Sequence, residues 1–378
     1  MITVRRVITV RWAIAVAVRG CLTLGCSVLG CLATGCLATG CGEPSGAVDV
    51  GAADVIEAPR AHDAGRPEAG ALDAVALDAV ALDAGALDPE RCARCHASQA
   101  AAWRGSLHAI SDTDPIYLAE HAGSARDGEP DPWCATCHAP EGAPIGCAIC
   151  HVRDGQVISA HASGRAPHPT RVDLTRSDER ACAGCHDFDF PHDPGVAMQD
   201  TVDEWRHSAP AARGQTCADC HDPHAAPGRR DPVLAAGALD VRAHASRSGE
   251  GARLVLTLRS RAGHAVPTGD LFRRLVVRAR TGGIEREAIL ARRFARRAGR
   301  RVELADDRVP ARGARTVVLR FPRAGARIAW TIELEALPAE RARALALAES
   351  TWLTRLADGS TELPRETERP REHPLVRR

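Results

Sequence analysis

The spacing of apolar residues changes along the chain. From about residue 250, apolar and polar positions partly alternate in four runs, at 254–258, 275–277, 316–321 and 328–334. A period of two residues places alternate side chains on one face of a strand, so these runs predict strands with a buried face. We therefore expect a small all-β, sandwich-like domain over residues 241–358, in which 338–357 forms either a helix or a final strand.

The segment from 90 to 240 is broken repeatedly by glycine and proline. It predicts an α-helical, loop-rich domain of small helices, with almost no strand. Aromatic residues make up only 3% of the chain, with one Tyr and five Phe. Because large rings normally fill much of a domain core, other apolar groups are expected to occupy the interior here.

The first 41 residues have the pattern of an export signal. Arginines flank short apolar runs up to Arg19, and residues 20–42 contain no charge. The sequence Leu37-Ala38-Thr39-Gly40-Cys41 resembles a bacterial lipobox, which makes Cys41 the lipidation candidate, with Cys31 as a second one. Plain cleavage and a retained membrane anchor are the alternatives. All three predict a protein outside the cytoplasm, in the periplasm or, as a lipoprotein, at the outer membrane or cell surface.

Two segments without a folding pattern flank the predicted domains. Residues 42–89 are acidic, rich in Ala and Asp, and free of aromatic residues. Such a segment buries too little apolar surface to fold, so it predicts a disordered linker, with an alanine-rich helix over 69–87 as the alternative. Residues 359–378 predict a disordered tail. The expected order is signal or lipoprotein segment 1–41, linker 42–89, helical domain 90–240, β-domain 241–358 and tail 359–378.

Charge is distributed unevenly, although the formal net charge is only +1. All 49 basic residues are Arg, and residues 241–378 hold 30 of them against 16 acidic residues. Two uses of this excess are open: pairing with carboxylates of the acidic first domain and its cofactors, or binding of an anionic partner. The uniform absence of Lys is typical of a coding bias, so no nucleic-acid partner is predicted.

Ten of the 15 cysteines form five Cys-x-x-Cys pairs, and a histidine directly follows every pair. This pattern attaches haem in c-type cytochromes: the two thiols bond to the vinyl groups along one porphyrin edge, and the histidine binds the iron. The five sites are Cys92/Cys95/His96, Cys134/Cys137/His138, Cys147/Cys150/His151, Cys182/Cys185/His186 and Cys217/Cys220/His221.

Paired cysteines also occur in three different kinds of site, and each of these fits the chain less well. Zinc ribbons need an even number of pairs, and redox-active pairs or structural disulfides leave the histidines unexplained. The sequence therefore predicts five covalently attached c-type haems with the five histidines as proximal iron ligands. Their macrocycles would supply the apolar core that the aromatic residues do not.

Eleven further histidines are available for the opposite face of the irons. Setting aside His62 in the linker and His373 in the tail leaves nine for five positions, whereas the only methionines are Met1 and Met198. This supply favours bis-His coordination, in which a histidine binds each face of the iron. Such coordination gives a low reduction potential and leaves no axial position free for a substrate. The distal candidates are His108, His161, His168, His224 and His264, followed by His121 and His207.

Residues 91–225 resemble the cytochrome c-552/c-554 type multihaem family. The shared signatures are the first attachment site followed by Trp103-x-x-Ser106-x-His108, and the close spacing of the second and third sites. The resemblance implies a loop-rich helical haem domain and a distal role for His108. A second copy, Trp205-Arg-His207-Ser208-Ala-Pro210, has proline at the histidine position, so ligation there requires that His207 substitutes.

The β-domain carries a motif of its own, Gly263-His264-Ala-Val-Pro267-Thr-Gly269. It is similar to a Gly-His-x-x-Pro-Thr-Gly element of related multihaem proteins that have a β-domain. The similarity implies that His264 caps a haem and joins the two domains. A histidine in an ordinary loop is the alternative.

Taken together, these features favour an exported protein that transfers electrons through five, mostly bis-His, haems. Redox proteins are the expected partners, and a membrane is contacted only through the anchor or signal segment. An oxidoreductase that acts on a small nitrogen or sulfur compound at one open haem iron is the alternative, and no catalytic residue is assigned. A fixed subunit of a larger surface conduit, docked through the β-domain, is a third class.

Overall fold

The computed structural model describes residues 88–124, 131–161, 166 and 168–364. These residues fall in one of the two contact units of the chain, residues 58–378. The predicted signal segment, the lipidation candidate Cys41, almost all of the linker and most of the tail lie outside the described residues. Within the described ranges, no helix is long and apolar enough to cross a membrane.

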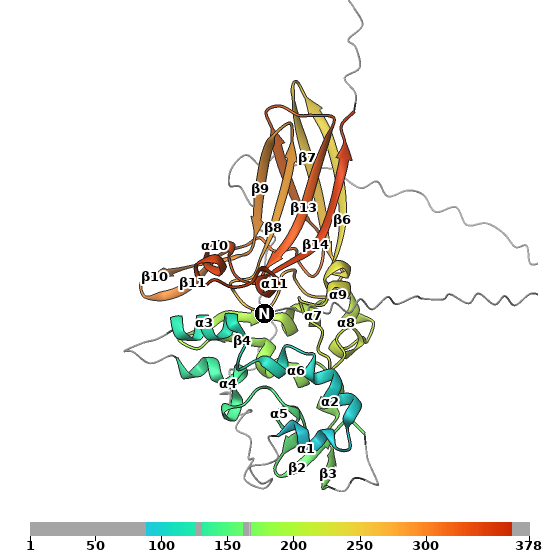
Figure 1. The fold of residues 1–378 in the computed structure, drawn as a ribbon, viewed down its shortest axis with the longest axis vertical. Helices are drawn as coiled ribbons and strands as arrows, with labels where there is room; N and C mark the ends of the chain where they lie inside the picture. The colour runs from blue at the N-terminus through green and yellow to red at the C-terminus, as the bar shows by residue number, and fades with distance from the viewer. Residues whose placement is uncertain (1–87, 125–130, 162–165, 167, 365–378) are drawn as a thin grey trace, which may run out of the picture. The chain divides into compact units, whose positions relative to one another are not determined.

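Short helices form most of the regular structure before residue 239 (Figure 1). They are α1 (Pro89–Ala93), α2 (Ala97–Arg104), α3 (Pro115–Gly123), α4 (Ala135–His138), α5 (Cys147–His151), α6 (Arg180–His186), α7 (Thr201–Arg206), α8 (Ala209–Ala212) and α9 (Pro232–Gly237). Single 3-10 turns cover His108–Ile110, Pro132–Cys134, Pro140–Gly142, Leu174–Ser177 and Cys217–Asp219. Two more helices, α10 (Ala339–Ala344) and α11 (Glu349–Trp352), lie near the C-terminus.

Asp-Pro pairs explain where several of these helices begin. Asp114 accepts a hydrogen bond from the Ile116 N–H at 2.9 Å before α3, and Asp231 accepts one from the Val233 N–H at 2.9 Å before α9. The carboxylate satisfies a backbone N–H that the helix leaves free, and the proline after it has a φ already suited to a helix.

The strands lie mainly after residue 238. They are β1 (Val152–Arg153), β2 (Gln156–Ser159), β3 (Thr170–Val172), β4 (Asp187–Phe190), β5 (Asp193–Asp200), β6 (Leu239–Ser248), β7 (Gly251–Ser260), β8 (Arg274–Thr281), β9 (Ile284–Leu290), β10 (Arg292–Arg297), β11 (Arg300–Asp306), β12 (Arg315–Phe321), β13 (Arg327–Glu335) and β14 (Leu353–Glu362). The two larger sheets have the strand orders β12-β7-β6 and β14-β13-β8-β9, and all their pairings are antiparallel.

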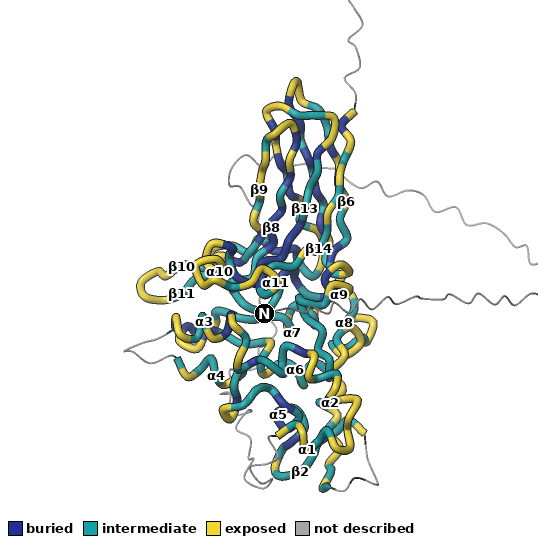
Figure 2. Tube along the Cα trace, in the orientation of Figure 1, coloured by how far each residue is buried: buried dark blue, intermediate teal, exposed yellow. Residues whose placement is uncertain are grey.

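These two sheets share one apolar core. Leu254, Leu256 and Leu258 alternate along β7 and are fully buried, as expected for one face of a strand. They belong to the same cluster of buried side chains as Val277 of β8 and Ile332 of β13. Figure 2 shows this core as the dark blue segments of the strands. The arrangement is consistent with the predicted β-domain.

The expectation of almost no strand between 90 and 240 was wrong, because five short strands occur there, β1 to β5. The β1–β2 hairpin turns at Asp154 and Gly155, which both have positive φ, at +50° and +69°. An Asp-Gly pair between short apolar runs is a strong signal for such a turn, and its two strands are too short to show a period.

The C-terminal elements also differ in their bounds from the expectation. β6 begins at Leu239, just before the predicted domain boundary, and β14 continues to Glu362, which pairs with Arg327 of β13. The strand therefore runs past residue 358, because its pairing with β13 continues into the expected tail. The segment 338–357 contains both α10 and α11 and the first residues of β14, so both alternatives for it occur.

Apolar side chains cluster very unevenly between the described residues before 239, called the helical half below, and those from 239 to 364, called the β half. Of the described residues before 239, only Ile116 and Ala235 belong to the two clusters of buried apolar residues. In Figure 2 most of the helical half is half-buried or exposed. Within the described residues, the helical half therefore has no apolar side-chain core of its own, as the scarcity of aromatic residues predicts.

Candidate metal centres

Each Cys-x-x-Cys-His motif folds as about one helical turn. The third motif is the whole of α5, the second makes up α4 together with its N-cap Cys134, and the fourth forms the C-terminal end of α6. In the first and fifth motifs, the histidine N–H donates to the first cysteine carbonyl, at 2.9 Å for His96 to Cys92 and 2.8 Å for His221 to Cys217. A helical turn brings residues i, i+3 and i+4 to one face, so both thiols and the imidazole converge. All ten thiols are free.

Two of the ten attachment cysteines, Cys95 and Cys220, are exposed, whereas the other eight are half-buried. Cys95 follows the end of α1 and Cys220 follows the end of a 3-10 turn, whereas the second cysteines of the other three motifs lie within α4, α5 and α6. The haem-attaching role of Cys95 and Cys220 stays a prediction from the motif.

The backbone orients two of the proximal imidazoles directly. The Nδ1 atom of His151 lies 3.1 Å from the Ile158 carbonyl oxygen, and that of His221 lies 2.8 Å from the Pro227 carbonyl oxygen. When Nδ1 donates its proton to a carbonyl, Nε2 keeps its lone pair for a metal. These rings are therefore held in the tautomer that binds iron.

Three proximal histidines face a second histidine across a similar gap. The ring centres are 6.4 Å apart for His186 and His108, 6.2 Å for His151 and His224, and 6.4 Å for His221 and His264. An imidazole nitrogen binds a transition metal at about 2 Å and lies roughly 1.1 Å from its ring centre, so two rings on one metal have centres about 6 Å apart. The spacing fits an iron between the two rings of each pair, and the free thiols beside them fit a haem.

Burial favours the neutral form of these rings. It lowers the pKa of His186 to about 4 and that of His264 to about 4, and it also lowers the pKa of His108. A metal binds the neutral imidazole, so protons compete weakly for these nitrogens.

The loop that carries His264 packs against the segment of α7 and α8. Gly263 has φ +76°, and a Cβ atom at this position would lie 3.1 Å from Pro210 Cγ and 3.4 Å from Ser208 Oγ. Glycine is needed here both for the positive φ and for the close approach. The Ser260 hydroxyl donates to the His264 carbonyl at 2.7 Å and holds the loop from the β7 side.

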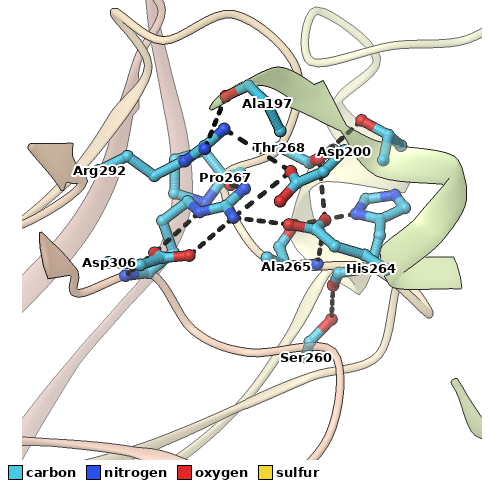
Figure 3. A network of polar contacts seen from close by, with 12 residues as sticks. Ala197, Asp200, Ser260, His264, Ala265, Pro267, Thr268, Arg292 and Asp306 are labelled. Atoms are coloured by element: carbon cyan, nitrogen blue, oxygen red, sulfur yellow. Dashed lines mark hydrogen bonds and ion pairs between the residues drawn. The ribbon is translucent and has the colours of Figure 1, made fainter. Parts of the chain in front are cut away.

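A polar network fastens the same loop to α7 (Figure 3). Glu204 of α7 accepts hydrogen bonds from the Ala265 N–H at 2.9 Å and the Thr268 hydroxyl at 3.0 Å. Its other carboxylate oxygen lies 2.6 Å from Arg308, and the Arg308 guanidinium also pairs with Asp306 at 2.8 Å. This network joins the helical half to the β half next to His264.

A second carboxylate lies beside Glu204. Asp200 acts electrostatically on Glu204, and its Oδ1 atom lies 3.7 Å from Arg292 and 3.6 Å from Arg308. Burial raises the pKa of Glu204 to about 8; Asp200 adds to this increase and Arg308 opposes it. Because burial and the neighbouring carboxylate both disfavour its charged form, Glu204 keeps a proton near neutral pH. Neither residue was predicted from the sequence, although their spacing of four at the start of α7 was a visible signal.

Arginines of the β half pair with acidic residues of the helical half. Arg292 donates to the Ala197 carbonyl at 2.7 Å and lies 3.7 Å from Asp200, and Arg301 lies 3.6 Å from Asp193. Part of the Arg excess therefore serves the contact between the two halves, which is the first of the two uses considered for it.

The second attachment site is arranged differently. Tyr117 of α3 stacks on His138 with ring centres 4.5 Å apart and planes 5° apart. It also stacks on His121, one helical turn later, at 5.2 Å. The Nε2 atom of His121 is buried and has no hydrogen-bond partner within the described residues. A tyrosine that was not predicted from the sequence thus lies against this proximal histidine.

Three other distal candidates have no ring contact with a proximal histidine in the described part of the chain. His161 and His207 are exposed, and the His207 Nδ1 lies 2.8 Å from the Asp203 carbonyl oxygen. His168 is half-buried, and its buried Nδ1 has no hydrogen-bond partner among the described residues. The substitution of His207 for Pro210 as a distal ligand stays a prediction.

Thiols of different sites approach one another closely. Cys92 and Cys147 lie close enough to interact electrostatically, as do Cys137 and Cys185, and Cys182 and Cys217. The first site therefore adjoins the third, the second adjoins the fourth, and the fourth adjoins the fifth. Cys150 of the third site also acts electrostatically on Cys182 and Cys185 of the fourth. The five motifs thus form one connected cluster.

No family model matches the chain. Over 149 residues, 35% of the chain, it is 26% identical to a tetraheme cytochrome-c type protein of Allochromatium vinosum, of which it covers 70%. Its fold is similar to the crystal structure of a penta-heme cytochrome c552 from Thermochromatium tepidum, with a TM-score of 0.60 and 17% identity, covering 72% of this chain and 98% of that one. Together with the attachment motifs, these similarities support a multihaem cytochrome of the c type.

Proposed function

We propose that this chain is an exported electron-transfer protein with five covalently bound c-type haems. The three facing histidine pairs carry the proposal, because a histidine on both sides of an iron closes it to substrates and suits electron transfer. When bound, the haems supply the one-electron chemistry. The protein attaches them, orients their axial ligands and keeps them close together.

The assignment of axial ligands follows from the ring contacts. Three haems take the pairs His186 with His108, His151 with His224, and His221 with His264. The first and second haems take His96 and His138 as proximal ligands. Their distal ligands are proposed to come from His121, His161 and His168, because two of these have buried ring nitrogens without a partner in the described residues.

The electrostatic interactions between thiols of different sites support a branched path for electrons. Cysteines of the fourth site interact with cysteines of the second, third and fifth sites, whereas the first site adjoins the third. Since these thiols mark where porphyrin edges are attached, the fourth haem is proposed as the branching point. Redox proteins would then dock at the ends of the path.

One observation favours the alternative function, oxidation or reduction of a small nitrogen or sulfur compound. The ring stacked on His138 is Tyr117 and not a histidine, so the second site is where an open iron would lie. In that case the other four haems would deliver electrons to it.

Two measurements on the purified holoprotein test the main proposal. Intact mass and a pyridine haemochrome assay should give five haems per chain, and fewer than five would contradict the count. Spin-resonance spectra of the oxidised protein should show only low-spin iron. A high-spin iron that accepts added ligands would instead support the enzyme.

Export and lipidation need a separate experiment. Cells that make the full chain are labelled with radioactive fatty acid, alongside cells that make Cys41→Ala and Cys31→Ala. Label in the wild type and in Cys31→Ala, but not in Cys41→Ala, is the expected result. Label that persists in Cys41→Ala would contradict lipidation at that residue.

A further inference from the structure

Three arginines gather between α3, the start of α9 and the loop before β8. Arg230 pairs with Asp114 at 2.7 Å, and Arg273 donates to the Thr268 carbonyl at 2.9 Å. Arg229 lies close enough to both for mutual repulsion. Asp114 and Asp270 are the acidic residues that act on Arg229 and Arg273.

The negative charge of the nearby acidic residues does not balance the positive charge of these three arginines. Three guanidinium groups face two carboxylates, and both carboxylates already have other partners: Asp114 accepts from the Ile116 N–H at 2.9 Å and Asp270 from the Phe272 N–H at 2.9 Å. The Nη1 atom of Arg229 and the Nε atom of Arg230 are buried and have no hydrogen-bond partner within the described residues.

An unmatched charge in such a place is costly. Burial lowers the pKa of Arg229 to about 9, and repulsion from Arg273 and Arg230 adds to the decrease. Buried guanidinium groups with unused donors are stabilised by an anion that accepts several hydrogen bonds. The cluster therefore has the character of a site for a carboxylate or a similar anion.

Its position points to the second attachment site. The Asp114 carboxylate that binds Arg230 also accepts from the Tyr117 N–H at 3.3 Å, and the Tyr117 ring stacks on His138. Asp270, Asp114 and Arg273 all act electrostatically on His138. Arg273 also acts on His186 and His264 of the neighbouring sites.

We propose that Arg229, Arg230 and Arg273 bind the propionate carboxylates of the haem attached at Cys134 and Cys137. The inference rests on the proposed haem attachment and goes further by assigning residues to the other edge of one haem. Haem carries its propionates opposite the vinyl edge, and the guanidinium group matches a carboxylate with two parallel hydrogen bonds. A free small anion, held beside an open iron, is the rival occupant.

The experiment compares Arg229→Met and Arg229→Lys with Arg312→Met. Arg229 makes no hydrogen bond through Nη1 to the described residues, so its loss removes charge at little structural cost. Arg312 is an exposed arginine in the loop before β12 and is the matched control. Haem content and intact mass are measured first. A wild type with fewer than five haems contradicts the proposed function, and not this inference alone.

Potentiometric titration of the five haems gives the main result. Removing a positive charge, and leaving a propionate unpaired, stabilises the ferric form. In Arg229→Met one of the five midpoint potentials should therefore fall by about 59 mV. For a one-electron couple, this shift makes the ferrous-to-ferric ratio at a fixed potential about ten-fold lower. Arg229→Lys should show a smaller decrease, and Arg312→Met none.

Two results would overturn the inference. One is a set of five unchanged potentials in an Arg229→Met protein that holds all its haems. The other is a shift in the potentials of the wild type when inorganic phosphate is added, because that would indicate a free anion. If Arg229→Met does not attach all its haems, Arg229→Lys is used as the test instead. Its redox-difference infrared spectrum should show altered carboxylate bands, and unaltered bands would contradict propionate binding.

Discussion

The ring centres of His221 and His264 lie 6.4 Å apart, with their planes inclined by 20°. His221 ends the fifth attachment motif of the helical half, whereas His264 lies in a loop that follows β7 of the β half. In the proposed assignment, the β half thus supplies one face of a haem site. The stability of that site then depends on the contacts that hold the two halves together.

Removal of His264 should open one iron. In His264→Ala, the ferric protein should show a high-spin signal from one of its five haems, because no side chain replaces the distal imidazole. The measurement is spin resonance of the oxidised protein, with haem content as a check. His244→Ala removes an exposed histidine of β6 and should leave all irons low-spin. An unchanged spectrum in His264→Ala would rule out this ligand.

Substitution of Gly263 should lower the free energy of unfolding for two separable reasons. Gly263→Ala introduces a side chain at φ +76° and also brings a Cβ atom to 3.1 Å from Pro210 Cγ. Gly313→Ala introduces the same strain at φ +86° but meets nothing within 4 Å. Strain alone should cost about 1 kcal/mol in each variant. We expect Gly263→Ala to lose more unfolding free energy than Gly313→Ala. We also expect it to reduce the low-spin signal of the haem at the fifth attachment site, because His264 is its proposed distal ligand. Equal losses of free energy would show that the contact with Pro210 is unimportant.

Arg308 should be the most costly residue to remove from the interface. Its side chain is 5% exposed and lies 2.6 Å from Glu204 and 2.8 Å from Asp306. Arg308→Met leaves these carboxyl groups buried without their cation, so the free energy of unfolding should fall by about 3–5 kcal/mol. Denaturant unfolding followed by circular dichroism measures the loss. The exposed control Arg312→Met should stay within about 0.5 kcal/mol of the wild type.

Glu204 should make stability depend on pH. Burial raises its pKa from 4.5 to about 8, so between these values the folded protein keeps a proton that the unfolded chain releases. The stabilisation is therefore full below about pH 4.5 and is lost as pH rises to about 8, at no more than about 1.4 kcal/mol per pH unit. Glu204→Gln removes this titration, so its stability should fall less between pH 5 and pH 8. The exposed neighbour Asp203→Asn should keep the wild-type dependence. A Glu204→Gln profile that follows the wild type would contradict the buried proton on Glu204.

The two Trp-x-x-Ser segments show which features of the haem sites could be predicted from the sequence and which could not. Ser106 accepts from the Ala109 N–H at 3.2 Å and Ser208 from the Ala211 N–H at 3.3 Å, so both segments form the same local hydrogen bond. The first segment contains a histidine at the matching position and the second contains Pro210. In the structure Pro210 packs beneath Gly263, and the histidine next to it comes from the β half.

The sequence by itself determined the chemistry of attachment, because each Cys-x-x-Cys-His motif lies within about one helical turn and its spacing alone brings thiols and imidazole together. It also indicated four strands of the β half, β7, β8, β12 and β13, and named His108, His224 and His264 as distal candidates. Only the tertiary structure decided which proximal histidine each of these faces, since that depends on how distant segments pack. The ring of Tyr117 on His138 and the arginine cluster could not be seen in the sequence, because burial and mutual approach create their properties. The spacing of Asp200 and Glu204 was visible, but the raised pKa of Glu204 arises only on burial.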